Sequence, residues 1–201
     1  MLPDRLAWPA LITIAFFGPA SAAESDPTAA ATAVVEELHA ALLQASEDDT
    51  SSVEQRVELL TPVVKKCHDL DYMSKFVLRR HLNELSAAEV GEFQRLFERL
   101  SITSYASRFT NLPEGSLTTT GSEQLRADRV QVDTELRLDD GRIVTLSYTL
   151  QNSGGDWRII NVVADGVSDL ALRRAEYSSI IRKKGFAALL DHISAQIAAL
   201  G

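Results

Sequence analysis

Four histidines and one cysteine are the side chains in this sequence best suited to metal binding or nucleophilic catalysis. The histidines are His39, His68, His81 and His192. No two of them are four residues apart, the spacing that places two ligands on one helix face, and the sequence has no Cys-His zinc pattern. The sequence therefore predicts neither a metal site nor a bound cofactor.

The dipeptide Cys67-His68 is the one place where a thiol stands next to a base. Neighbours in sequence do not face each other on a helix, so we interpret Cys67 as an ordinary packed cysteine rather than a nucleophile. His81 falls on an apolar stripe, which is typical of a hydrogen-bonded core histidine. The chain also lacks a G-x-S-x-G elbow, a phosphate loop and a dinucleotide fingerprint. We therefore expect no catalytic residues, and a protein that is not an enzyme.

Two arginines, Arg173 and Arg174, lie within or beside an apolar helical stripe near the C-terminus. That stripe is formed by Leu170, Tyr177 and Ile181. One interpretation is that the arginine stems cover apolar surface while both guanidinium groups point to solvent. The other is that a guanidinium stands at the mouth of an apolar pocket and meets a polar or anionic head group, or a partner protein.

The elements that position these side chains are helical in the first half of the chain. The periodicity and capping signals predict helices over residues 28–46, 53–66, 71–82 and 87–109. Ser52 with Gln55, and Ser86 with Glu89, form capping boxes. Pro62 is expected to kink or shorten the second helix.

The predicted helix 87–109 carries apolar side chains on two sides. Val90, Phe93, Leu96, Phe97 and Leu100 share one stripe, whereas Ile102, Tyr105 and Phe109 occupy another side. We attribute the second side to contact with another helix, with a bound ligand as the alternative.

After residue 115 the pattern changes to the alternation of half-buried strands. Strands are expected over residues 130–138, 143–150 and 157–164, with an earlier strand over 116–126 and tight turns at 139–141 and 152–155. Two closing helices follow, capped by Ser168 and separated by Gly185. This order predicts an α+β fold with helices packed on an antiparallel sheet of three or four strands.

The bulk properties narrow the function further. The chain has 201 residues and a net charge of −8, which argues against nucleic-acid binding. Arg5, the apolar run 6–17 and the small residues 18–23 are typical of a signal peptide. We expect cleavage after Ala23, giving an exported domain over 24–201, with an uncleaved anchor as the alternative.

The stretch WRIINVVADGVSDL, residues 157–170, resembles the MlaC-like periplasmic lipid-carrier family, also known as the toluene-tolerance auxiliary proteins. The shared features are Trp157 with a following basic residue, an alternating apolar run, and Asp165-Gly166-Val167-Ser168 leading into a helix. Asn161 stands where the family usually has Asp. That departure and the longer following helix are similar to the hopanoid-associated HpnM branch.

The resemblance implies an NTF2/MlaC-like fold in which the helices and a curved sheet enclose an apolar cavity. It implies a periplasmic shuttle for a hopanoid or phospholipid between an inner-membrane transporter, of RND or ABC type, and an outer-membrane component. Arg173 and Arg174 are then expected to meet the head group or a partner. The expected lipid-binding residues are Phe93, Phe97, Leu100, Tyr105, Val144, Leu146, Tyr148, Ile160, Val162, Val167, Tyr177 and Ile181.

Two other functions remain open at this point. A non-catalytic adaptor of a membrane transport complex has the same apolar pattern, because cores and cavities use the same residue types. An isomerase or dehydratase in a cone-shaped fold needs an acid or base facing the cavity, for which Asp133 and His81 are the candidates.

Overall fold

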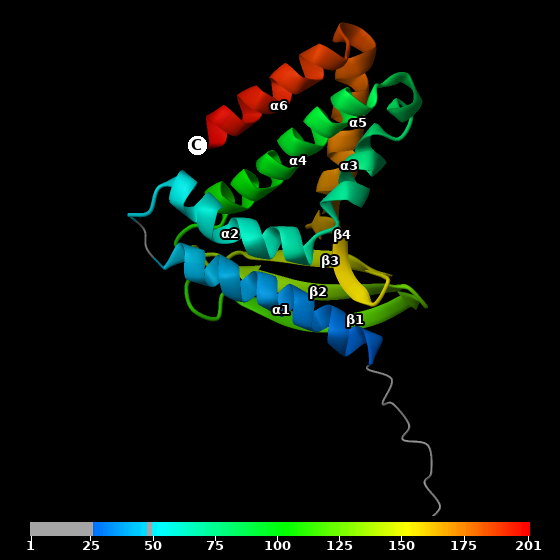
Figure 1. Ribbon diagram of the computed structural model, residues 1–201. Helices are drawn as coiled ribbons and strands as arrows, with labels where there is room; N and C mark the ends of the chain where they lie inside the picture. Colours follow the sequence, from blue (N-terminus) through cyan, green and yellow to red (C-terminus); the bar gives the residue numbers. More distant parts are fainter. Residues whose placement is uncertain (1–25, 48–49) are drawn as a thin grey trace, which may run out of the picture.

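A computed structural model describes residues 26–47 and 50–201 (Figure 1). The expected signal peptide and its cleavage site lie outside these residues. Within the described ranges, no helix has the length and apolar content needed to cross a membrane.

Four α-helices and a short 3₁₀ helix precede the sheet, as the capping signals predict. Both capping boxes are present: the Ser52 hydroxyl accepts a hydrogen bond from the backbone N–H of Gln55, and the Ser86 hydroxyl accepts one from that of Glu89. The elements are α1 (Pro27–Ser46), α2 (Val53–Cys67), α3 (Leu70–Leu78), η1 (Leu82–Glu84) and α4 (Ala87–Arg108).

The end of α2 agrees with the prediction to within one residue, but two details of the helices differ from the expectation. Helix α2 is not shortened at Pro62 but continues to Cys67. Pro62 lies on the exposed side of the helix. Because proline has no backbone N–H, one carbonyl group of the preceding turn has no intrahelical donor, and water can reach it there. The buried side chains of Leu60 and Val64 hold the helix against the core. Helix α3 ends at Leu78 rather than residue 82, because the chain turns there to bring Leu82 and Leu85 onto the core.

The sheet has five antiparallel strands in sequential order, one more than expected. The additional strand is a two-residue β5, which the sequence pattern is too short to reveal. Asp165 (φ 46°) and Gly166 (φ 79°) form the tight turn between β4 and β5, and the Asp165 carboxylate accepts from the backbone N–H of Thr145 at 2.9 Å. The strands are β1 (Leu117–Arg126), β2 (Arg129–Arg137), β3 (Ile143–Ser153), β4 (Asp156–Ala164) and β5 (Val167–Ser168).

The core consists of two separate apolar clusters. The first lies where α1, α2 and the end of α4 cover one face of the sheet, and it includes Leu38, Ile102 and Leu150. The second lies among α3, the first half of α4, and the closing helices α5 (Asp169–Lys184) and α6 (Phe186–Leu200). Figure 1 shows α6 alongside α4, and α3 beside α5. Helix α4 therefore belongs to both clusters, which explains its two apolar sides.

Candidate functional site

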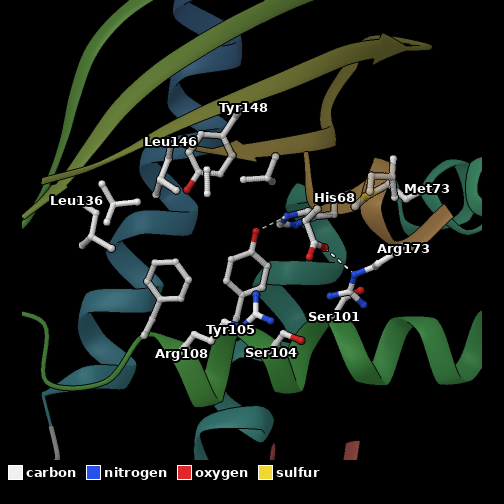
Figure 2. A pocket seen from close by; sticks show the side chains of 16 residues that line it. His68, Met73, Ser101, Ser104, Tyr105, Arg108, Leu136, Leu146, Tyr148 and Arg173 are labelled. Atoms are coloured by element: carbon white, nitrogen blue, oxygen red, sulfur yellow. Dashed lines mark hydrogen bonds and ion pairs between the residues drawn. The ribbon is translucent and has the colours of Figure 1, made fainter. Parts of the chain in front are cut away.

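A cavity of about 260 Å³ lies where the two clusters meet (Figure 2). Strands β2, β3 and β4 form one wall, and α4 forms the opposite wall, with α3 and α5 at one side. The lining residues are His68, Met73, Ser101, Ser104, Tyr105, Arg108, Phe109, Leu136, Val144, Leu146, Tyr148, Val162, Ala164, Asp169, Leu170 and Arg173.

Two periodicities bring these side chains together. On β3, Val144, Leu146 and Tyr148 alternate onto the helix-covered face of the sheet, and Val162 of β4 is the register partner of Tyr148. On α4, Ser101, Ser104, Tyr105 and Arg108 recur at the three- and four-residue spacing of one helix face. The walls of the cavity are thus mainly aliphatic on the sheet side, with hydroxyl and guanidinium groups on the helix side.

The polar pair His68 and Tyr105 stands in the cavity wall. Nδ1 of His68 is 3.1 Å from the carbonyl oxygen of Val64, so Nδ1 carries the proton and Nε2 is the acceptor. The Tyr105 hydroxyl, 2.9 Å from Nε2, therefore donates to His68. Burial lowers the pKa of His68 to about 4 and raises the pKa of Tyr105, so both side chains are neutral near pH 7.

A second histidine–tyrosine pair supports the sheet side of the cavity. His39 on α1 and Tyr148 on β3 are both buried, and His39 Nε2 is 3.2 Å from the Tyr148 hydroxyl. Burial lowers the pKa of His39 to about 4 and raises the pKa of Tyr148. The contact gives His39 Nε2 and the Tyr148 hydroxyl a hydrogen-bond partner among apolar residues. Because both side chains are neutral near pH 7, this pair adds no charge to the sheet wall.

Arg173 is a largely but not fully buried cation of the site. Its Nε donates to the carboxylate of Asp169 at 2.6 Å, and its guanidinium carbon is 5.8 Å from the ring centre of Phe97. Only 12% of its side chain is exposed. Burial acts to lower the pKa of Arg173, but Asp169 and Tyr177 outweigh burial and the pKa is raised. Of the two interpretations, snorkelling to solvent is wrong for this arginine.

Arg174 and Arg108 occupy different surroundings. The Arg174 guanidinium stacks over Phe76, 5.0 Å from the ring centre, and does not line the cavity. Arg108, in the last turn of α4, lines the cavity and is exposed. No acidic side chain in the described part of the chain forms an ion pair with it.

Six of the expected site residues meet at the cavity, namely Tyr105, Val144, Leu146, Tyr148, Val162 and Arg173. The others lie elsewhere. Phe93, Phe97, Leu100, Tyr177 and Ile181 pack within the second apolar cluster. Ile160 is the extra residue of a β-bulge in β4, and Val167 is half exposed at the β4–β5 turn. The physical reason is that α4 and α5 each present apolar residues to the core as well as to the cavity.

The cavity also includes residues that the sequence analysis did not identify as site residues. Phe109 could have been predicted because it lies on the same side of the predicted helix as Tyr105. Leu136 could have been predicted because it alternates in phase with the inward-facing residues of its strand. His68, Met73 and Asp169 carry no local signal, since they approach the cavity only through the packing of α2, α3 and α5 on the sheet.

The two groups required for the enzyme alternative do not line the cavity. Asp133 accepts from Ser147 at 2.6 Å and from Gln131, on the sheet face away from α1 and α2. His81 is buried beside η1, with Nδ1 3.3 Å from Glu84.

Burial raises the pKa of Cys67 to about 11, which keeps this thiol protonated.

Comparison with known proteins identifies the family. The MlaC protein family matches residues 32–195. The chain belongs to the MlaC family. A curated relative, the toluene tolerance protein ttg2D of Pseudomonas putida, is 23% identical over 128 residues, which cover 63% of this chain and 58% of that protein. The match therefore spans little more than half the length of this relative.

A solved structure shares the fold of this MlaC family member. It is the phospholipid-binding protein from Ralstonia solanacearum in complex with a phospholipid, with a TM-score of 0.74 and 16% identity. The match covers 88% of this chain and 99% of that one. The likeness confirms the expected α+β fold with helices packed on a curved antiparallel sheet.

Proposed function

We propose that this MlaC family member is a periplasmic lipid carrier that holds the apolar part of its cargo in the cavity between α4 and the sheet. The observation that carries the proposal is the cavity itself, whose sheet wall is aliphatic and whose histidines are neutral. Such a wall favours burial of a hydrocarbon chain, while the charged side chains of the cavity, Arg108, Asp169 and Arg173, lie on its helix side. The volume of about 260 Å³ lies just below the range of about 300–1,000 Å³ of ligand sites, and the presence of this cavity favours a carrier over an adaptor with a filled core.

The cargo in this proposal is a hopanoid or a phospholipid. The fold is that of a protein described as phospholipid-binding, which supports the second, and the departure at Asn161 supports the first through the HpnM branch. The carrier receives or delivers its cargo at an inner-membrane transporter of RND or ABC type and at an outer-membrane component. Arg173 contacts the polar end of the lipid, whereas Arg174, outside the cavity, is available to a partner.

A carrier needs no nucleophile, and the groups around the cavity agree with that role. The lone pair of His68 Nε2 is occupied by the Tyr105 hydroxyl, and the carboxylate of Asp169 is occupied by Arg173. Neither is free to act as a general base in this arrangement. We therefore propose a binding protein rather than an enzyme.

Mass spectrometry of organic extracts tests the proposal. The mature protein is purified from its native periplasm and its extract compared with that of a variant whose cavity is blocked, Leu146→Trp. A hopanoid or phospholipid at about one molecule per chain in the unmodified protein, and its loss from the variant, is the expected result. A folded protein that carries no lipid and takes none from liposomes supports the adaptor instead.

A further inference from the structure

A second cavity, of about 360 Å³, lies among α4, α5 and α6 on the other side of Arg173. It shares Ser104, Arg108, Asp169 and Arg173 with the first cavity, so these four residues separate the two spaces. The remaining lining residues are Leu100, Leu172, Glu176, Tyr177, Gln196, Ala199 and Leu200.

Unpaired buried polar atoms gather at this second cavity. Among the described residues, six buried side-chain nitrogen or oxygen atoms have no hydrogen-bond partner. Three of them belong to residues that line the second cavity, namely Nη1 of Arg173, the hydroxyl oxygen of Tyr177 and Oε1 of Gln196. The Arg173 guanidinium and the Tyr177 hydroxyl lie near enough to interact electrostatically, but form no hydrogen bond of normal geometry with each other. Native proteins pair nearly all buried polar atoms, so a concentration of unpaired ones around one cavity indicates a binding site.

The carboxylates beside this cavity are already paired. Asp169 accepts from Nε of Arg173 at 2.6 Å, and Glu176 is 2.9 Å from Nε2 of His192. The donors that remain are the guanidinium of Arg108, Nη1 of Arg173 and the Tyr177 hydroxyl. Two guanidinium groups and a phenol match the oxygens of a phosphate or carboxylate, while Oε1 of Gln196 is an acceptor for a neighbouring hydroxyl or N–H.

We propose that the second cavity is a polar site that receives the anionic head group of the same amphiphile whose chain occupies the first cavity. This inference rests on the proposed carrier function and specifies its substrate class, an amphiphile with a phosphate or carboxylate next to a hydrogen-bond donor. The molecule passes between the cavities beside Ser104 and Arg108, and α6 covers its head group. The donors for the anion thus come from α4 and α5, and α6 contributes the acceptor of Gln196.

Calorimetric titration with matched probes tests this assignment. The probes are oleoyl lysophosphatidic acid, oleoyl monoacylglycerol with the same chain and no phosphate, and inorganic phosphate alone. We expect the full-length mature protein to prefer the phosphate-bearing amphiphile over the neutral one by roughly tenfold or more, as a few charged hydrogen bonds give. Inorganic phosphate alone is expected to bind far more weakly than either amphiphile.

Two variants then test whether the second cavity causes the preference for the phosphate-bearing amphiphile. Tyr177→Phe and Gln196→Met each remove one unpaired polar atom with little change in volume, and neither residue lines the first cavity. Tyr177→Phe removes a donor to the phosphate and is expected to reduce the preference for the phosphate-bearing probe several-fold. Gln196→Met removes an acceptor for a hydroxyl, which both amphiphiles carry, so it is expected to weaken both affinities and to leave the preference unchanged. Tyr72→Phe is the matched control, because Tyr72 packs on Phe76 and lines neither cavity. Thermal unfolding confirms that the variants are folded.

The outcomes separate the two proposals. Equal affinity for both amphiphiles, or an unchanged preference in Tyr177→Phe, overturns the head-group site and leaves the carrier function standing. Inorganic phosphate that binds as tightly as the lysophosphatidic acid also overturns it, because the site then serves a free anion. If neither amphiphile binds the unmodified protein, both proposals fail.

Discussion

The hydroxyl of Tyr105 donates to Nε2 of His68 over 2.9 Å, and the other nitrogen of the same ring donates to the carbonyl of Val64. Each polar atom of the imidazole is thereby satisfied inside the protein. The end of α2 and the last turn of α4 are joined through this ring. The pair therefore keeps the cavity wall neutral and also holds two of its helices together.

Removing the Tyr105 hydroxyl should destabilise the protein. In Tyr105→Phe, Nε2 of His68 is left buried without a partner, which costs about 1–3 kcal/mol of unfolding free energy. Urea denaturation measures the change. Tyr72→Phe, at a half-buried position on α3, should alter the unfolding free energy by less than about 0.5 kcal/mol. Equal effects of the two substitutions would show that the His68 contact contributes nothing.

Stability should fall as the solution becomes acidic. The pKa values of His39 and His68 drop from 6.5 to about 4 on folding, so the unfolded chain binds more protons between these values. The stabilisation is complete above pH 6.5 and is lost progressively down to about pH 4. Each histidine accounts for up to about 3 kcal/mol.

Urea titrations at several pH values between 4 and 7.5 measure this dependence. The double variant His39→Gln and His68→Gln removes both titrating groups while keeping a hydrogen-bonding atom near Nε2. Its unfolding free energy should vary much less across the same window. If the unmodified protein has the same stability at pH 4.5 and pH 7, the buried neutral state of these histidines is refuted.

A charge on the sheet wall of the cavity should impair lipid binding. Val144 lines the cavity and is only half-buried, so Val144→Asp introduces a carboxylate there with a limited effect on folding. Contact with a hydrocarbon chain then desolvates this charge, and the affinity for oleoyl lysophosphatidic acid should fall at least about tenfold. Thr149→Asp, on the same strand but the opposite face, is the control. Equal affinities of the two variants would place the lipid elsewhere.

Reversing the charge of Arg173 should affect folding as well as binding. Arg173→Glu places a second carboxylate next to Asp169 in a largely buried position, and we expect a loss of about 2 kcal/mol or more in unfolding free energy. Arg174 is half-buried and stacks over Phe76, and Arg174→Glu should lower the unfolding free energy clearly less than Arg173→Glu does. Thermal unfolding of both variants checks the order. A fully stable Arg173→Glu protein would mean that the ion pair with Asp169 is dispensable.

The fold could be predicted from the sequence to a large extent because its signals are local. Ser52 and Ser86 cap helices through residues three positions away, and the alternation from Val130 to Leu136 reflects one buried face of a strand. The exceptions arise where packing outweighs local preference. Helix α2 continues through Pro62 because its buried side holds it in place, and β5 is too short for any periodicity to show.

The site was less predictable because its two walls come from distant parts of the chain. Strand alternation correctly placed Val144, Leu146 and Tyr148 on the cavity side. The phenylalanine stripe of α4 suggested cavity residues, but Phe93 and Phe97 instead fill the second apolar cluster. Periodicity shows that a side chain is turned away from water, and only the packing of helices shows whether it meets protein or open space.

Helix α4 contributes to both apolar clusters, and this has a consequence for how the protein is made. Synthesis proceeds from the N-terminus, so α1, α2, α4 and the first four strands emerge before residue 169. The first cluster can close at that stage, whereas Phe93 and Phe97 of α4 have no cover until α5 and α6 follow. A nascent chain that stops before Asp169 has a nearly complete sheet wall but an exposed apolar stripe. The last thirty or so residues therefore cover an apolar surface that would favour aggregation if it stayed exposed, and they also complete the wall of the cavity.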